Sequence, residues 1–91
     1  MKIIYTPQKA DKSLSYAFPS EGVVEATMDG ESDTFDFSEM PDGKAEKIES
    51  TLFACPVVSA EKVDGELTVK LLHWYGPDAA DEEKTEREVI I

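Results

Sequence analysis

The chain has 91 residues and a net charge of −11, from 20 acidic and nine basic side chains. This length is typical of one domain, and a composition rich in Val, Ile, Phe and Tyr argues against a disordered chain. Because nucleic acids and anionic membranes attract clustered lysine and arginine, the acidic balance argues against both as partners.

The N-terminal residues predict two short strands, KIIY at residues 2–5 and LSYAF at residues 14–18. Their β-branched and aromatic residues suit a pleated, half-buried strand. The polar segment TPQKADKS between them, residues 6–13, predicts a loop. The first apolar run is much shorter than a signal peptide or a membrane span requires, so we expect neither.

A first hairpin is expected at Asp29-Gly30. Asp-Gly between alternating apolar runs favours a type I′ turn, which needs positive φ at both central residues. The apolar residues of its two arms are Val24, Ala26 and Met28, then Phe35 and Phe37. A two-residue loop and a four-residue loop both place these sets on one face, so the loop length stays open.

The middle of the chain is harder to interpret. Residues 38–46 (SEMPDGKAE) predict a break, and the apolar residues of KIESTLFA, residues 47–54, fit both helical and alternating spacing. Threonine and phenylalanine in this segment favour a strand. We therefore expect an extended segment that bends at Cys55-Pro56 before the next strand.

A second hairpin, VVSAEKV-DG-ELTVKLLHW, is centred on Asp64-Gly65 and is the clearest local prediction. A two-residue loop pairs Val63 with Glu66. One face then holds Val58, Ala60, Leu67, Val69 and Leu71, and the other holds Ser59, Glu61, Thr68 and Lys70. Such a separation is what an antiparallel sheet with one solvated face needs.

The tail GPDAADEEKTERE, residues 76–88, predicts either a mobile acidic loop or one short helix near residues 78–86. Pro77 suits a first helical position, whereas Glu82 and Glu86 repel at helical spacing. The final EVII predicts a last strand. The elements together predict a mostly β protein in which residues 1–91 form a single domain. We expect a small antiparallel sandwich or rolled sheet of six or seven strands.

The sequence matches no catalytic or metal-binding template. Loops that begin at Asp29, Asp42 or Asp78 do not have the ligand spacing of an EF-hand loop. Cys55 and His73 are too few for a zinc site, and the apolar context FACPVV predicts a buried, unreactive Cys55. We therefore expect no enzyme, no cofactor, no metal and no small-molecule substrate.

His73, Trp74 and Tyr75 form the one group with binding character, because aromatic side chains at a loop edge can anchor a protein partner. The alternative is that Trp74 covers the core and Tyr75 begins a turn, since large aromatic side chains usually bury most of their area.

The order of DTFDFSEMPDG, IESTL, PVVSAEKVDGELTVKLL and GPDAADEEKTE resembles small uncharacterised proteins encoded near tail genes by bacteriophages and prophages of Gram-positive bacteria. The resemblance covers residues 33–88 and includes no catalytic residue. It implies a non-enzymatic role in virion assembly, structure or host interaction.

Two functions follow as hypotheses. The first is a protein-interaction or structural module that binds a virion component or a second copy of itself through sheet edges or exposed aromatic side chains. The second is an acidic mimic of nucleic acid that inhibits a basic host protein. Because Lys44, Lys47, Lys62 and Lys70 interleave with acids along the chain, we expect a mixed surface, which favours the first hypothesis. The single cysteine fits a protein that is cytoplasmic when made, and the resemblance implies that it becomes virion-associated afterwards.

Overall fold

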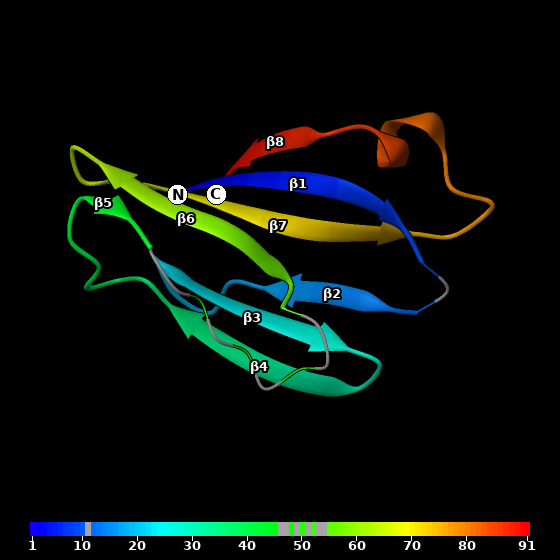
Figure 1. Ribbon diagram of the computed structural model, residues 1–91, viewed down its shortest axis with the longest axis horizontal. Coiled ribbons are helices and arrows are strands. Elements are labelled where there is room, and N and C mark those ends of the chain that lie inside the picture. Colours follow the sequence, from blue (N-terminus) through cyan, green and yellow to red (C-terminus); the bar gives the residue numbers. More distant parts are fainter. Residues whose placement is uncertain (11, 46–47, 49, 51, 53–54) are drawn as a thin grey trace.

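The computed structural model describes residues 1–10, 12–45, 48, 50, 52 and 55–91. Within these residues the protein is mostly β, with strands in two stacked sheets and one short helical turn (Figure 1). The predicted all-β fold class is therefore confirmed. The elements are β1 (Lys2–Lys9), β2 (Leu14–Ala17), β3 (Val23–Met28), β4 (Glu31–Asp36), β5 (Gly43–Lys44), β6 (Val57–Val63), β7 (Glu66–Tyr75), the 3₁₀ helix η1 (Asp81–Lys84) and β8 (Arg87–Ile90).

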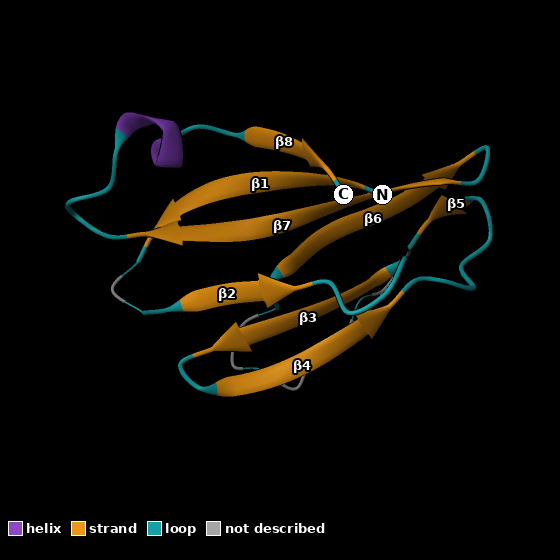
Figure 2. Ribbon diagram, turned by 180° about the vertical axis from the view of Figure 1, so that it is seen from behind, coloured by secondary structure: helices purple, strands orange, loops and turns teal. Residues whose placement is uncertain are grey.

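The larger sheet has the strand order β5-β6-β7-β1-β8, and the smaller one has the order β2-β3-β4 (Figure 2). All neighbouring strands are antiparallel except β1 and β7, which are parallel. The core lies between the sheets, because alternate residues of the long strands point inward. Its buried apolar side chains are Ile3, Val24, Ala26, Met28, Phe35, Phe37, Leu52, Val57, Ala60, Leu67, Val69 and Leu71.

β1 extends beyond the predicted KIIY, and the first residues of the expected loop at 6–13 belong to this strand. The correction has a physical reason. β1 pairs with β7 along its whole length, from Lys2 to Lys9, while β8 pairs only with Lys2 to Tyr5. Pro7, which has no backbone N–H, therefore lies where one side of β1 has no strand beside it, a position that tolerates proline.

The Asp29-Gly30 hairpin has the shorter of the two loops left open by the sequence. Met28 pairs with Glu31, and both turn residues have positive φ, 48° and 86°. The backbone N–H of Ser13 donates to the Asp29 carboxylate at 3.0 Å, which connects this turn to the start of β2. The two apolar sets of the arms face the core, as predicted.

The Asp64-Gly65 hairpin also has the predicted turn and pairing, with Val63 opposite Glu66 and Ala60 opposite Val69. The predicted inward position of Val58 is wrong. The register shifts between Val57 and Ser59, so Val57 pairs with Leu71 and Val58 is the extra residue of a bulge. As a result Val57 is 4% exposed and Val58 is 49% exposed.

The bulge makes a prediction about two adjacent valines. Replacing Val57 with alanine should lower the free energy of unfolding by about 1–3 kcal/mol, because it leaves a cavity in the core. The same replacement at Val58 should change it by less than about 0.5 kcal/mol, as at other surface positions. Urea denaturation of the two variants measures both values. A larger loss for Val58→Ala would show that Val58, and not Val57, is the residue that points into the core.

The middle segment differs from the prediction at one point. The expected break at residues 38–46 contains a two-residue strand, β5, which pairs with Glu61 and Lys62 of β6. The predicted strand at 47–54 lies largely outside the described residues, and the described residues 48, 50 and 52 have no regular secondary structure. Leu52 belongs to the core, and Ile48 packs against it.

Two further expectations concern Cys55 and the tail. Cys55 is exposed rather than buried, because it precedes β6 and the next residue, Pro56, occupies the buried position. The short helix expected near residues 78–86 is the single 3₁₀ turn η1, in which the Ala80 N–H donates to the Glu83 carboxylate at 3.0 Å. The predicted last strand is β8, which pairs antiparallel with β1.

Candidate functional site

His73, Trp74 and Tyr75 lie at the end of β7 and are all half-buried. Trp74 packs against the core, and its Nε1 donates to Oε1 of Gln8 at 2.8 Å. The His73 ring lies edge-on to Tyr5, with ring centroids 6.0 Å apart. Because successive side chains of a strand point to opposite faces, Trp74 lies on one face of the sheet with Gln8, and His73 lies on the other with Tyr5. Two of the three rings therefore already have intramolecular neighbours. The role of this predicted group in partner binding stays a prediction.

Tyr16 connects the two sheets beside this group. Its hydroxyl, on β2, donates to the backbone carbonyl of Leu72 on β7, and its ring lies 6.1 Å from that of Tyr5. Burial raises the pKa of Tyr16 far above its ordinary value, and Tyr5 raises it further. A neutral, hydrogen-bonded phenol in this position favours packing rather than acid–base chemistry.

The raised pKa of Tyr16 predicts a loss of stability at high pH. The folded state holds the phenol neutral, so this contribution is intact below the unfolded pKa of about 10 and decreases as the pH rises above it. The urea midpoint should therefore fall more steeply above about pH 10 for the wild type than for Tyr16→Phe. At pH 7 the variant should be less stable by about 1 kcal/mol, the value of one hydrogen bond. Parallel pH profiles for the two proteins would contradict this assignment.

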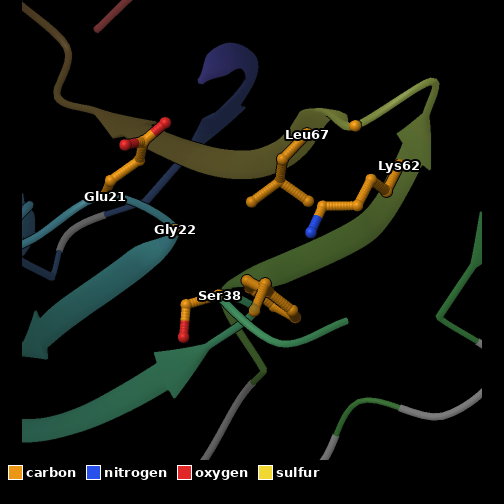
Figure 3. Close-up of a pocket in the computed structure, with 7 residues that line it drawn as sticks. Glu21, Gly22, Ser38, Lys62 and Leu67 are labelled. Atoms are coloured by element: carbon orange, nitrogen blue, oxygen red, sulfur yellow. The ribbon is translucent and has the colours of Figure 1, made fainter. Parts of the chain in front are cut away.

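A small pocket of about 190 Å³ lies between the β6–β7 hairpin and the smaller sheet (Figure 3). Glu21 and Lys62 lie on opposite sides of it, and the Lys62 amine donates to the carbonyl of Met40 at 2.8 Å. Its lining residues are Glu21, Gly22, Phe37, Ser38, Lys62, Gly65 and Leu67. The Ser38 hydroxyl in this lining donates to the Asp36 carboxylate at 2.6 Å, which holds it in the turn after β4.

The charges are divided between the two sheets. Residues 13–43, which form the smaller sheet and its turns, contain eight acids and neither lysine nor arginine. The rest of the chain contains 12 acids and all nine bases, a net charge of −3. The lysines that suggested a mixed surface belong to this second part. Sequence reasoning missed the division, although a run of 31 residues without a base is a visible signal.

The larger sheet has cross-strand ion pairs instead. Lys2 lies 3.7 Å from Glu88, and Lys44 lies 3.9 Å from Glu61. Arg87 lies over the Tyr5 ring, 5.2 Å from its centroid. These exposed pairs contribute little to stability, and this part of the chain keeps the smaller net charge of −3.

β8 carries the most exposed apolar surface of the described residues. Five large apolar side chains are well exposed in that part of the chain, and three belong to β8 or follow it directly: Val89 at 37%, Ile90 at 67% and Ile91 at 51%. Val89 lies opposite the fully buried Ile3 of β1 and therefore points to the core side of the sheet. Its exposure shows that the smaller sheet leaves the core-side face of β8 uncovered.

A hollow of about 420 Å³ lies next to the exposed end of β8, lined by Met1, Phe18, Ser20, Glu21 and Ile91. Backbone hydrogen bonds hold Ile91 beside Met1, with Ile91 N donating to Met1 O at 2.9 Å. Met1 and Phe18 pack against the core from its edge. The apolar surface therefore continues from β8 into a concave site that can accept a side chain.

The other sheet edges are less suited to binding a strand. β5 has only two residues, one of them lysine, and short charged edges resist pairing. β4 carries Glu31, Asp33 and Asp36, and the Ser50 hydroxyl donates to Asp33 at 3.1 Å. β2 contributes no well-exposed large apolar side chain. β8 is thus the candidate functional site, which the sequence had indicated only as an apolar last strand.

No protein-family model, curated protein or solved structure matches this chain. Across the described residues, no group of three or more His, Cys, Asp or Glu side chains is arranged to hold a metal ion. No helix in that part of the chain is long and apolar enough to cross a membrane.

Proposed function

We propose that the protein is a non-enzymatic interaction module that binds a partner strand along β8. The observation that carries this proposal is the exposure of Val89, Ile90 and Ile91 on the last strand of the larger sheet. A strand in that position presents a row of unpaired backbone N–H and C=O groups. An added strand satisfies those groups and covers the apolar side chains at the same time.

The hollow beside β8 supplies specificity in this proposal. In strand addition the backbone hydrogen bonds give affinity, and pockets for alternate side chains distinguish one partner from another. The hollow between Met1, Phe18 and Ile91 accepts one apolar side chain of the partner. The resemblance to phage proteins makes a tail or baseplate protein the expected partner of this kind, met in the cytoplasm during assembly.

Two matched substitutions test the proposal. Val89→Lys places a charge on the binding edge, whereas Val63→Lys places the same charge on the exposed end of the Asp64-Gly65 hairpin. The immobilised wild-type protein and Val63→Lys should capture the same protein from an extract of the producing cell, and Val89→Lys should lose it. Circular dichroism confirms that both variants fold. Equal capture by all three proteins would remove β8 as the site.

The division of charge favours the second candidate function, an acidic surface that imitates nucleic acid and binds a basic protein. On the outer face of the smaller sheet, Glu25 and Asp36 lie among serine and threonine side chains, without a neighbouring base in residues 13–43. Hydrogen bonds from Ser38 lower the pKa of Asp36, so this carboxylate keeps its charge in mildly acidic solution.

Polylysine is a suitable probe for this second candidate. Neutralising Glu21, Glu25 and Glu39 to glutamine should weaken binding and reduce its salt dependence. A control set, Glu66→Gln with Asp78→Asn and Asp81→Asn, removes the same charge from the other part of the chain and should have a smaller effect. Equal effects of the two sets would show that only total charge matters and would exclude a specific acidic surface.

A further inference from the structure

We propose that the strand bound by β8 is the β8 of a second copy of this chain, so that two molecules join their larger sheets edge to edge. This inference rests on the proposed function and names its partner. Two β8 strands related by a two-fold axis normal to the sheet run antiparallel. The joined sheet then has ten strands, and each β8 becomes an interior strand.

The symmetry restricts the possible registers. A two-fold axis normal to the sheet keeps each side chain on its own face, and residues directly opposite each other in an antiparallel pair share a face. One residue of β8 must therefore lie directly opposite its own copy, with the axis midway between the two. Only registers centred on Arg87, Glu88, Val89 or Ile90 lie within β8.

The charged residues of β8 exclude two of these registers. Centring on Arg87 or Glu88 places two like charges directly opposite each other, which is destabilising. Centring on Val89 pairs Val89 with its copy, Glu88 with the second copy's Ile90, and Arg87 with the second copy's Ile91. Centring on Ile90 leaves Arg87 and Glu88 without opposite residues in the second β8. The Val89-centred register therefore pairs the most residues without like charges.

The same register covers the apolar surface. Val89 and Ile91 share the core-side face of β8, and the smaller sheet leaves both exposed. In the Val89-centred pair the two copies of Val89 meet on that face. Each Ile91, beside the hollow that Met1 and Phe18 line, lies opposite the second copy's Arg87. The apolar contact across the axis is therefore made by the two Val89 side chains.

The division of charge permits two copies of so acidic a chain to approach along this edge. Both overall views place β8 at the opposite side of the molecule from β3 and β4 (Figures 1 and 2). Eight of the 11 net negative charges belong to the part that contains these strands. The segment next to β8 is itself acidic, because residues 78–88 contain six acids with Lys84 and Arg87. Lys2 and Lys70 lie 3.7 Å and 3.5 Å from Glu88 and Glu86, so part of this local charge is paired, and salt screens charges beyond a Debye length of about 8–10 Å. An edge contact of one strand buries little area, so we expect a weak, concentration-dependent dimer.

Cysteine cross-linking tests the register. In a Cys55→Ser background, single cysteines are introduced at Val89, Glu88 and Ile90. In the Val89-centred pair, the two copies of residue 89 have Cα atoms about 4.5–5.5 Å apart, within disulfide range. The two copies of residue 88 are offset by two residues and lie about 8 Å apart, which is too far. We expect Val89→Cys to form covalent dimers at least about tenfold faster than the other two variants.

Sedimentation velocity supplies the second measurement. The wild type and Val63→Lys should shift from monomer toward dimer as the concentration rises, while Val89→Lys stays monomeric. Equal cross-linking at all three positions, or a wild type that stays monomeric at every concentration, would overturn the inference. If self-association is absent but Val89→Lys still loses a captured partner, the proposed function stands and only its partner changes. If Val89→Lys changes neither self-association nor capture of a partner, both the inferred dimer and the proposed function are wrong.

Discussion

Replacing Ile3 with alanine is expected to lower the free energy of unfolding by about 2–5 kcal/mol, the range for emptying a fully buried position. Ile3 lies in β1, between β7 and β8, and is fully buried. The loss is a large part of the roughly 5–14 kcal/mol that a domain of this length has in total. Urea denaturation, with an unchanged m-value, is the measurement.

Ile90→Ala is the control for this prediction, because Ile90 lies on the neighbouring strand but is 67% exposed. It should change the stability of the monomer by less than about 0.5 kcal/mol. Comparable losses at the two positions would mean that β8 is covered within a single molecule. The comparison must be made on dilute protein, where any association across β8 is absent.

Gly22→Ala is expected to be the most destabilising glycine substitution, by about 2–4 kcal/mol. Gly22 has φ of 79°, in the left-handed region that alanine rarely adopts. A Cβ at this position would lie 2.9 Å from the Cα of Ser38, and backbone cannot move aside as a flexible side chain can. The substitution therefore adds a steric clash to the backbone strain.

Gly30→Ala separates these two causes. Gly30 has a similar φ of 86°, but a Cβ there would meet no atom within 4 Å. This variant should lose only the strain contribution, about 1 kcal/mol. Thermal or urea denaturation measures the loss in free energy of unfolding for each variant. Equal losses for Gly22→Ala and Gly30→Ala would show that the contact between Gly22 and Ser38 is not tight.

Local chemistry made the two hairpins predictable. Each Asp-Gly turn adopts the positive φ values that its residues favour, and the alternation of apolar residues in the arms determines which face is buried. The bulge at Val58 was not predictable in this way. Val57 and Val58 are the same residue type, so alternation can be continued from either, and only the pairing with β7 decides which one enters the core.

Long-range pairing explains most of what the sequence left open. The parallel contact of β1 with β7 joins segments more than 60 residues apart, and no turn residue specifies it. It also extends β1 past Pro7, where local chemistry predicts a loop. Among the candidate site residues, the sequence indicated Trp74 and His73 by their type, but it could not reveal that Gln8 and Tyr5 would lie beside them.

The candidate edge itself was only half predictable. The apolar residues of EVII predict a strand, but the sequence cannot tell whether the chain's own second sheet covers it. That depends on how far the three-stranded sheet extends beneath the five-stranded one, which is a property of the whole fold. The exposure of Val89 on the core-side face provides that information.

The most direct test of an open β8 edge is amide hydrogen exchange at residues 87–90. Alternate N–H groups of an edge strand point toward its neighbour and away from it. In dilute protein we predict protection of the amides that face β1 and rapid exchange of those that point away, with protection of the second set appearing as the concentration rises. Protection of all four amides at high dilution would contradict an open edge. Rapid exchange of the outer amides at every concentration would agree with an open edge but would contradict self-association through it.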